Sequence, residues 1–447
     1  MDFSHIKAIY FIGIGGIGMS ALARYFRQAG KQVHGYDKTP SEITDVLQAE
    51  GIGVHFEDSV SQIPADFCDS GQTLVVYTPA VPQSHTEMKY FKENGFRLLK
   101  RSQVLGAITR NSRSLAVAGT HGKTTTSSIL AHILVESGAS VSAFLGGVAE
   151  NFDSNLVLNG SEWTVAEADE FDRSFLQLSP DIACVTSMDA DHLDIYGDAS
   201  SLEEGFRDFA RCLKPGGALL VRYNLDLQGE TYGLEAGAEY RFENVRVVNE
   251  AYRFDFVFGG KRYENYEFPK PGRHNLLNAL AAVSMAVKAG FEPGRLLSAL
   301  ATFKGVKRRF SYVIRRDDLI FIDDYAHHPT EINALFQAVD EMFPEREKTI
   351  VFQPHLFSRT RDFLDGFAES LSQFDNVLLL AIYPARELPI EGISSGLLLG
   401  KITAKNKSLV TKENLVEVVK GMNPSLLLTV GAGDIGAEVE RIKRALA

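Results

Sequence analysis

The stretch Leu115–Leu134, LAVAGTHGKTTTSSILAHIL, decides which kind of fold the chain adopts. An apolar segment of strand type runs into a cluster of glycine, lysine and threonine, and a helical pattern follows directly. The backbone N–H groups of such a loop and the positive end of the helix bind phosphate, and glycine allows the phosphate to approach closely. Lys123 adds a positive charge, and the hydroxyl of Thr124 suits Mg²⁺. The sequence therefore predicts a nucleotide-phosphate loop between a strand and a helix.

This loop is shorter than the usual phosphate loop G-x-x-x-x-G-K-[ST], because Val117 stands where that pattern has its first glycine. An ordinary helix start that happens to contain glycine, lysine and threonine is the alternative interpretation. The strand pattern before the loop and the helix pattern after it favour phosphate binding.

A second glycine-rich loop lies near the N-terminus. GIGGIG, Gly13–Gly18, follows a predicted strand at Lys7–Ile12 and precedes a predicted helix from about Met19 to Ala29, and Asp37 ends the next predicted strand. Taken alone, this pattern suggests NAD. However, GAGDIG at Gly431–Gly436 satisfies the same expression, so the pattern is weak, and for the second match a tight turn after a strand is favoured.

Composition limits the function classes. The chain has 447 residues, 45% of them hydrophobic, and a net charge of -11, which predicts two to four soluble domains and argues against nucleic acid or an anionic membrane as the main partner.

The scattered Cys68, Cys184 and Cys212 indicate neither a disulfide framework nor a structural zinc site, so a cytoplasmic location is expected. The uncharged run Ala8–Ala23 has some features of a signal peptide, but its glycines favour a strand, loop and helix.

Strand and helix patterns alternate along most of the chain, which predicts α/β domains with parallel sheets. The exception is Tyr240–Glu267, where alternating residues predict antiparallel hairpins with a turn at Gly259–Gly260. Ligands gather at the carboxyl ends of strands in such sheets. Four polar motifs follow predicted strands: EADEFDRSF, DADHLDIYG, DDYAHHPTEI and QPHLFSRTRD.

Each polar motif leaves alternatives open. The acidic residues and histidine of the first two motifs suit Mg²⁺ beside a nucleotide, or form a solvated acidic loop. The two histidines of DDYAHHP are metal ligands, nucleotide contacts or helix caps. Arg359 and Arg361 clamp a carboxylate or phosphate, or form a solvated pair. The basic cluster KGVKRRF, Lys304–Phe310, contacts phosphate or lies on a solvated face.

In combination, GTHGKTTT, EADEFDRSFL, DADHLDIYG, GRHNLLNALAA, DDYAHHPTEI and FQPHLFSRTRD resemble the Mur ligases, the ATP-dependent amino-acid ligases of peptidoglycan synthesis, over essentially the whole chain. The resemblance implies a Rossmann-like N-terminal domain for a UDP-sugar, residues 1–105. It implies a central P-loop ATPase-like domain, residues 106–310, with a parallel sheet and a small antiparallel part. A Rossmann-like C-terminal domain for the amino acid, residues 311–447, completes the expected chain.

The resemblance also assigns roles to residues at matching positions. The ATP-binding positions are Gly119, Thr120, Gly122, Lys123, Thr124, Thr125, Asn275, Asn278, Arg309, Asp324, His327 and His328. The UDP-sugar positions are Gly13, Gly15, Gly16, Gly18, Asp37, Thr78 and His121. The amino-acid positions are His355, Arg359 and Arg386, the metal positions are Thr124, Glu167 and His192, and the catalytic residues are Lys123, His192, Arg309 and His355.

The implied activity is ATP-dependent ligation of L-alanine to the lactyl carboxylate of UDP-N-acetylmuramate through an acyl phosphate, with Mg²⁺, without nucleic acid or stable membrane association. The oligomeric state stays open. Two departures from the family pattern stand out: Arg207 occupies the position of a lysine that is modified in relatives adding later amino acids, and Leu356 replaces a basic residue found in some members.

Three other functions compete with this one. A related ligase joins a ready-made tripeptide to the same sugar nucleotide, and FLGGVAENF resembles it, whereas QPHLFSRTRD favours the alanine reaction. An NAD-dependent oxidoreductase built on GIGGIG and a nucleotide-gated binding module without turnover are the rivals from other classes.

Overall fold

The computed structural model describes residues 3–189, 196, 198–385 and 387–446. By internal contacts the chain divides into two compact units. Unit 1 contains Met1–Val245, Arg253–Phe268 and Leu277–Lys304, and unit 2 contains Arg246–Tyr252, Pro269–Leu276 and Gly305–Ala447. The domain boundaries expected from the resemblance, near residues 105 and 310, stay predictions.

The first sheet of unit 1 is parallel, with the order β3-β2-β1-β4-β5. Its strands are β1 (Ala8–Ile12), β2 (Gln32–Tyr36), β3 (Gly53–His55), β4 (Thr73–Tyr77) and β5 (Arg97–Lys100). Its helices are α1 (Ile17–Gln28), α2 (Glu42–Ala49), α3 (Thr86–Glu93), α4 (Arg101–Arg110) and the short 3-10 helices η1 (Val60–Gln62) and η2 (Ala65–Phe67). The predicted first strand and helix are confirmed to within two residues at each end.

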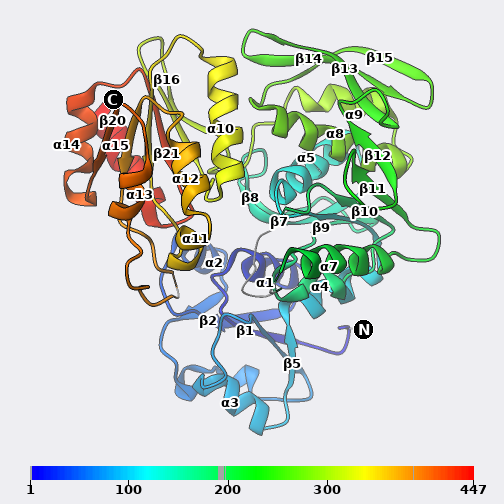
Figure 1. Ribbon diagram of the computed structural model, residues 1–447. Helices are drawn as coiled ribbons and strands as arrows, with labels where there is room; N and C mark the ends of the chain where they lie inside the picture. Colours follow the sequence, from blue (N-terminus) through cyan, green and yellow to red (C-terminus); the bar gives the residue numbers. More distant parts are fainter. Residues whose placement is uncertain (1–2, 190–195, 197, 386, 447) are drawn as a thin grey trace. The chain divides into compact units, whose positions relative to one another are not determined.

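Alternation along β1 explains how this sheet is covered. Ile9 and Phe11 join the core cluster that contains residues of α1, whereas Tyr10 and Ile12 join the cluster that contains residues of α3. Figure 1 shows α1 and α2 on one side of the sheet and α3 on the other. The glycine-rich loop Gly13–Gly16 consequently lies at the carboxyl edge of β1, where it enters α1.

The central sheet is mixed, with the order β15-β14-β13-β12-β11-β10-β6-β9-β7-β8. Its strands are β6 (Arg113–Ala118), β7 (Val141–Ala149), β8 (Ser154–Leu158), β9 (Trp163–Glu167), β10 (Ile182–Val185), β11 (Ala218–Arg222), β12 (Glu230–Gly233), β13 (Tyr240–Val248), β14 (Ala251–Phe258) and β15 (Lys261–Phe268). Its helices are α5 (Lys123–Glu136), η3 (Phe171–Gln177), α7 (Ala199–Arg211), α8 (Arg273–Lys288) and α9 (Pro293–Leu300). In Figure 1, α5, α8 and α9 lie on one face, and α4 and α7 on the other.

The expected hairpin turn is present at Gly259–Gly260, where both residues have positive φ. The antiparallel pair β7–β8 at the opposite edge was not expected from the sequence. Its strand SAFLGG does not alternate, because β7 is buried over most of its length and therefore apolar on both faces.

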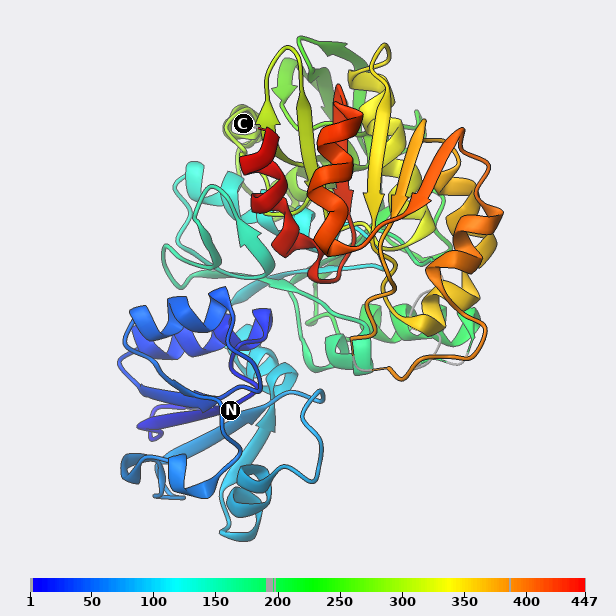
Figure 2. The same ribbon diagram turned by 90° about the vertical axis from the view of Figure 1, so that its left-hand side faces the viewer.

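Unit 2 contains the third sheet, with the order β16-β17-β21-β18-β19-β20. Its strands are β16 (Ser311–Arg315), β17 (Ile320–Asp324), β18 (Lys348–Phe352), β19 (Asn376–Leu379), β20 (Asn406–Leu409) and β21 (Leu426–Val430). Its helices are α10 (Pro329–Met342), α11 (Phe357–Asp362), α12 (Leu364–Leu371), α13 (Ser395–Lys401), α14 (Lys412–Met422), η4 (Asp434–Glu438) and α15 (Val439–Leu446). Figure 2 shows α14 and α15 side by side on one face.

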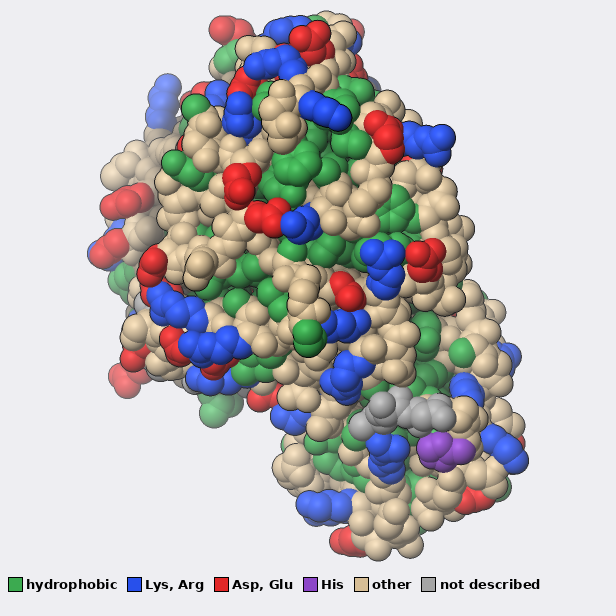
Figure 3. Space-filling model, turned by 90° about the vertical axis from the view of Figure 1, so that its right-hand side faces the viewer, with side chains coloured by type: hydrophobic (Ala, Val, Ile, Leu, Met, Phe, Trp, Pro, Cys, Tyr) green, Lys and Arg blue, Asp and Glu red, His purple; other side chains and the backbone are tan. Residues whose placement is uncertain are grey.

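The described surface carries both signs of charge. On the face drawn in Figure 3, lysine and arginine side chains are interspersed with aspartate and glutamate. None of the helices in the described residues combines the length and the apolar character needed to span a membrane.

Candidate phosphate and substrate sites

The predicted phosphate loop has a tightly constrained backbone. It connects β6 to α5, Gly122 caps α5 with a φ of 83°, and Gly119 has a φ of 130°. A Cβ on Gly119 would lie 2.2 Å from Oγ1 of Thr186, and a Cβ on Gly122 would lie 2.4 Å from Oδ1 of Asn278. Both glycines are therefore required by their backbone conformation and by close neighbours. Asn278, a predicted ATP contact, is thereby placed against the loop.

Lys123 forms a buried ion pair at the start of α5. Its Nζ lies 2.8 Å from Oε2 of Glu170 and donates to the carbonyl oxygen of Gly119 at 2.7 Å. The Glu170 side chain is only 1% exposed. Burial lowers the pKa of Lys123, but the nearby carboxylates of Glu170, Asp169 and Glu167 outweigh it and raise the pKa above its ordinary value. The lysine is therefore a fixed positive charge beside the loop.

The neighbouring Thr124 contacts the predicted metal ligand Glu167. The Thr124 hydroxyl lies 3.0 Å from each carboxylate oxygen of Glu167, which also accepts from the N–H of Gly146 at 2.8 Å. Burial raises the pKa of Glu167, and Lys123 opposes this effect. A hydroxyl and a carboxylate in contact are hard oxygen donors, which fit Mg²⁺ beside phosphates. The predicted third ligand, His192, lies outside the described residues, and no larger acid and histidine cluster occurs within them.

The remaining predicted residues of this loop take part in its hydrogen bonds or lie on the first turn of α5. The backbone N–H of His121 donates to Oγ of Ser187 at 2.8 Å, and its Nε2 lies 3.4 Å from a carboxylate oxygen of Asp189. The Thr120 hydroxyl donates to the carbonyl of Asp189 at 2.8 Å. Thr125 is half-buried in the first turn. The segment after β10 thus holds the loop in place.

The N-terminal glycine loop, which follows β1, contacts residues that follow the two neighbouring strands, β2 and β4. The N–H of Gly15 donates to Oδ2 of Asp37 at 2.7 Å, and a Cβ on Gly13 would lie 2.7 Å from the Thr78 side chain. Gly16 caps α1. The structure therefore brings the predicted Asp37 and Thr78 to the loop. The Asp37 carboxylate thus binds the backbone of the loop.

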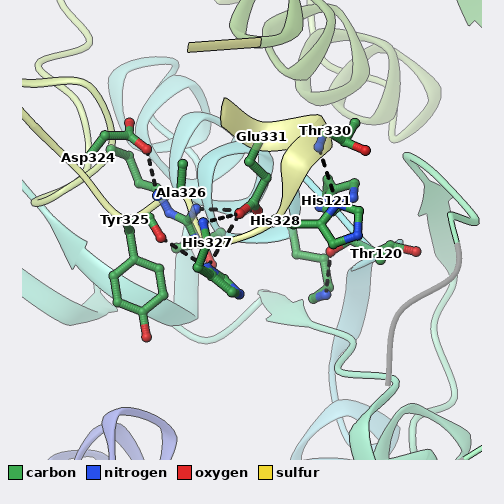
Figure 4. A network of polar contacts seen from close by, with 12 residues as sticks. Thr120, His121, Asp324, Tyr325, Ala326, His327, His328, Thr330 and Glu331 are labelled. Atoms are coloured by element: carbon green, nitrogen blue, oxygen red, sulfur yellow. Dashed lines mark hydrogen bonds and ion pairs between the residues drawn. The ribbon is translucent and has the colours of Figure 1, made fainter. Parts of the chain in front are cut away.

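In unit 2, Asp324 organises the turn between β17 and α10 (Figure 4). Its carboxylate accepts from the N–H groups of Ala326 and Phe310, each at 2.7 Å. Burial raises the pKa of Asp324 to about 6, against Arg309 and these two N–H groups, which lower it. Asp324 thus fixes the chain that carries the two predicted histidines.

The two histidines have different surroundings. The N–H of His327 donates to Oε2 of Glu331 at 2.9 Å, and its ring contacts the carbonyl of Tyr325 at 2.9 Å. His328 caps α10, since its Nδ1 accepts from the N–H of Thr330 at 3.3 Å. Helix capping, one of the alternatives for the histidine pair, is therefore confirmed for His328.

Arg309 lies beside the same turn, close to Tyr325 and Glu331. Its guanidinium carbon lies 4.9 Å from the centre of the Tyr325 ring, and Nη1 lies 3.9 Å from Oε1 of Glu331. The adjacent Arg308 is instead structural, because it bonds Asp323 at 3.1 Å and the carbonyl of Gly431 at 2.7 Å. The basic cluster therefore includes one arginine that stabilises the fold, Arg308, and the ATP-binding and catalytic roles of Arg309 stay predictions.

The structure describes two of the three residues that are predicted to bind the substrate amino acid, His355 and Arg359. The rings of His355 and His327 have centres 6.1 Å apart, and Arg359, on α11, is buried at 8% exposure. Arg361 is half exposed and pairs with the adjacent Asp362. A solvated role therefore holds for Arg361 and not for Arg359. Arg386 lies outside the described residues, and the assignment of an alanine pocket stays a prediction.

Two further predictions concern Asn275 and the second glycine match, Gly431–Gly436. Asn275 donates to the carbonyl of Pro271 at 2.7 Å, so one end of its amide closes the start of α8. The second glycine match, Gly431–Gly436, is a turn after β21, as expected, and Gln353 holds it by accepting from the N–H of Ile435 at 2.9 Å.

Reasoning from sequence missed the partners that hold these groups. Glu170 was seen only as part of an acidic cluster, and Ser187 and Glu331 were not singled out. Ser187 follows a strand, so its position at a carboxyl edge was a usable signal. For Glu170 no local signal exists, because its partner Lys123 is 47 residues away and is set by packing. Glu331 lies only four residues after His327, in the first turn of α10, where an acid commonly accepts from backbone N–H groups at the helix start, so its spacing was a usable local signal.

Comparisons with known proteins agree along the whole chain. Three family models match consecutive parts: the Mur ligase family catalytic domain over residues 8–113, the Mur ligase middle domain over 117–286, and the Mur ligase glutamate ligase domain over 308–433. A protein of Christiangramia forsetii named UDP-N-acetylmuramate–L-alanine ligase is 53% identical, over 100% of this chain and 99% of its own. One of the same name from Flavobacterium psychrophilum is 55% identical, with the same coverage.

Solved structures give the same result. The crystal structure of the UDP-N-acetylmuramate-alanine ligase MurC from Thermotoga maritima matches with a TM-score of 0.84 and 29% identity, over 98% of each chain. A murein peptide ligase from Psychrobacter arcticus matches with a TM-score of 0.70 and 22% identity over 98% of each chain, which shows a shared fold alone. With full-length relatives above half identity and three consecutive domain matches, the chain belongs to the Mur ligase family.

Proposed function

We propose that this chain ligates L-alanine to the lactyl carboxylate of UDP-N-acetylmuramate, with conversion of ATP to ADP and phosphate, in the synthesis of peptidoglycan precursors. The observation that carries the proposal is full-length identity of 53% and 55% to two proteins named for this ligation. The phosphate loop, with Lys123 paired to the buried Glu170, supports the use of ATP. We also propose that the reaction takes place in the cytoplasm, because it consumes ATP.

The chemistry explains why a ligase needs this loop. A carboxylate resists attack by an amine, because it is negatively charged and lacks a good leaving group. Transfer of the γ-phosphoryl group to the lactyl carboxylate gives an acyl phosphate, which the amine of alanine attacks. The tetrahedral intermediate then collapses to the amide and releases phosphate. Lys123, fixed beside the loop by Glu170 and the Gly119 carbonyl, neutralises charge on the transferred group.

We propose that the Thr124 hydroxyl and the Glu167 carboxylate hold Mg²⁺, with His192 as the further ligand that the resemblance implies. When bound, Mg²⁺ supplies positive charge that stabilises the phosphates during transfer. The direct contact at 3.0 Å between the hydroxyl and the carboxylate supports this assignment.

Replacement of the hydroxyl tests the metal assignment. Thr124→Val keeps the size of the side chain and removes an oxygen donor, so we expect a loss of activity of about 10- to 100-fold and a higher Mg²⁺ requirement. Thr124→Ser keeps the hydroxyl and should retain most of the activity. The measurement is ADP release at increasing Mg²⁺ concentrations. Equal Mg²⁺ requirements in the two variants would contradict the assignment.

The proposed reaction is tested directly with purified protein, ATP, Mg²⁺ and UDP-N-acetylmuramate. Each of L-alanine, L-serine, glycine and the tripeptide is offered in turn, and the product is weighed by mass spectrometry. We expect an L-alanine adduct, with ADP release that needs both substrates. A tripeptide adduct in its place would support the recycling reaction, and binding of NAD without any ligation would support an oxidoreductase.

A further inference from the structure

The N-terminal glycine loop has a cation beside it that the assigned roles leave unused. The positions predicted to bind the UDP-sugar within the first sheet are four glycines, Asp37 and Thr78, none of which carries positive charge. A diphosphate carries two or more negative charges, and a glycine loop offers it only N–H groups. The second nucleotide loop, by contrast, has Lys123.

Arg101, the first residue of α4, lies directly against that loop. A Cβ on Gly18 would lie 2.9 Å from Nη1 of Arg101 and 3.1 Å from its Cδ. Gly18 is the last of the four glycines of GIGGIG and lies in the first turn of α1. Any larger residue there would have to displace the arginine, so this glycine makes room for a guanidinium at the start of α1.

The guanidinium of Arg101 makes one polar contact within the described residues and retains further donors. Within the described part of the chain its polar contact is a single one, from Nη2 to Oδ2 of Asp169 at 3.4 Å, and the side chain is 22% exposed. An arginine has five N–H donors. The adjacent Lys100, in comparison, contacts Asp172 at 2.7 Å. Most donors of Arg101 are thus left for a ligand, while Asp169 fixes one edge of the guanidinium.

Asp169 connects this arginine to the other nucleotide loop. It directly precedes Glu170, which pairs with Lys123 at 2.8 Å. Two neighbouring acids of EADEFDRSF therefore position one cation at each glycine-rich loop. Both contacts lie within unit 1.

We propose that Arg101 binds the diphosphate of the sugar nucleotide and that Asp169 positions its guanidinium for this contact. The proposal rests on the proposed function, because it adds a binding residue for the same substrate. The planar guanidinium matches two phosphate oxygens at once, which suits a diphosphate better than a single ammonium does. The alternative is that Arg101 only ties α4 to the segment after β9.

Binding to the full-length, nucleotide-free protein separates these two roles. Isothermal titration calorimetry is carried out with UDP-N-acetylmuramate, UDP and ATP. For Arg101→Ala we expect the Kd of both UDP compounds to rise about 10- to 100-fold, the range for a charge-assisted contact, with the Kd of ATP within about twofold. Arg101→Lys keeps the charge and loses the planar guanidinium, so its Kd for the UDP compounds should lie between those of the wild type and Arg101→Ala. Asp169→Asn should raise this Kd by less than Arg101→Ala does. In turnover, the KM for the sugar nucleotide should rise more than kcat falls.

Arg110→Ala is the matched control. Arg110 is at the other end of α4 and donates to the carbonyl of Gln177 at 3.1 Å, so its removal also cuts a link from α4 to the central domain. We expect its Kd values for both UDP compounds to match those of the wild type.

Four results would overturn the inference. Unchanged UDP binding in Arg101→Ala, with a fall in unfolding temperature like that of Arg110→Ala, would leave Arg101 as a structural link. An equal loss of ATP and UDP binding would point to general damage to the fold. Should Arg101→Ala fail to fold, a wild-type Kd for UDP in Arg101→Lys and Arg101→Gln would refute the contact. A wild type that binds ATP and neither UDP compound would instead refute the proposed function as well.

Discussion

At the scale of single residues, the pair Lys123–Glu170 has an energetic consequence. A carboxylate at 1% exposure is stable only while its charge is compensated, and the ammonium at 2.8 Å supplies that compensation. The structure therefore couples the stability of this region to the residue that the proposed reaction needs most.

This coupling predicts different effects of Lys123→Ala on stability and on activity. Removal of the lysine takes the ammonium away from the buried Glu170 carboxylate, so we expect a loss of about 3 kcal/mol in the free energy of unfolding together with loss of ligation. The double variant Lys123→Ala, Glu170→Gln also removes the buried negative charge and should recover most of the stability while staying inactive. Denaturant unfolding and ADP release measure the two quantities.

Glu170→Gln alone is the control for the double variant, because it leaves the ammonium next to a neutral amide. If the double variant were no more stable than Lys123→Ala, the buried pair would not be the cause of the loss.

At the scale of elements, the glycine before α5 and the glycine after it are required for different reasons. Gly119 has a φ of 130° and no room for a Cβ, whereas Gly138, just beyond α5, has a φ of 85° and nothing within 4 Å. The first position is restricted by conformation and by packing, and the second by conformation alone.

Alanine at these two positions should therefore act differently. Gly138→Ala should cost about 1 kcal/mol, the strain of a left-handed alanine, and should keep ATP binding. Gly119→Ala should cost about 3 kcal/mol or more and weaken ATP binding, because Thr186 must move. Thermal unfolding and ATP titration check both. Equal effects of the two variants on ATP binding would contradict the assigned geometry.

The packing of α3 against the first sheet buries an acid beside the side chains of Tyr10 and His55. Glu87 is fully buried, and its Oε2 accepts from the hydroxyl of Tyr10 at 2.8 Å. Burial raises the pKa of Glu87 to about 7, against the Tyr10 hydrogen bond, which lowers it. Between about pH 4.5 and 7 the folded state therefore holds a proton that the unfolded state has released.

The sign of the pH dependence follows from this difference. Because the folded state binds more protons in that window, the free energy of unfolding falls as pH rises through it, by about 3 kcal/mol from this group. Glu87→Gln cannot titrate and keeps an acceptor for Tyr10, so the difference between variant and wild type should grow from pH 4.5 to pH 7.5 in favour of the variant. Denaturant unfolding at several pH values measures it, and parallel profiles would contradict it.

At the scale of the whole molecule, the first sheet and the central sheet belong to one unit, and specific polar contacts join α1 to β8 in addition to a shared apolar core. The amide of Asn155, on β8, donates to the carbonyl of Ile17 at 2.6 Å and to the hydroxyl of Ser20 at 2.9 Å. Arg24, also on α1, donates to Oγ of Ser154 at 2.7 Å. Helix α1, which begins at the N-terminal glycine loop, is thereby anchored to β8 of the central sheet.

Loss of this anchor should appear locally. Asn155→Ala removes two donors to α1, so we expect faster amide exchange in α1 and β8, measured by mass spectrometry, and a loss of about 2 kcal/mol. Asn151→Ala is the control, since Asn151 also makes two hydrogen bonds, to Thr302 and Lys304, neither of which involves α1. Faster exchange in α1 for both variants would show that the anchor has no specific role.

Sequence alone determined the class of fold, the family and the two glycine-rich loops. These rest on short-range signals: a strand pattern, glycines that allow positive φ, and a helix pattern lie within about twenty residues of one another, and their order does not depend on the rest of the chain. The same reasoning placed β1 and α1 to within two residues and interpreted Gly431–Gly436 as a turn.

Only the tertiary structure decided which side chain serves which loop. Arg359 and Arg361 are two residues apart and equivalent in the sequence, yet one is buried and the other exposed, because α11 turns only one of them inward. Glu170 reaches Lys123 and Arg101 reaches Gly18 across 47 and 83 residues respectively, distances in sequence over which no local pattern exists. Burial and ion pairing depend on which strands become neighbours, and that is settled when the sheets form.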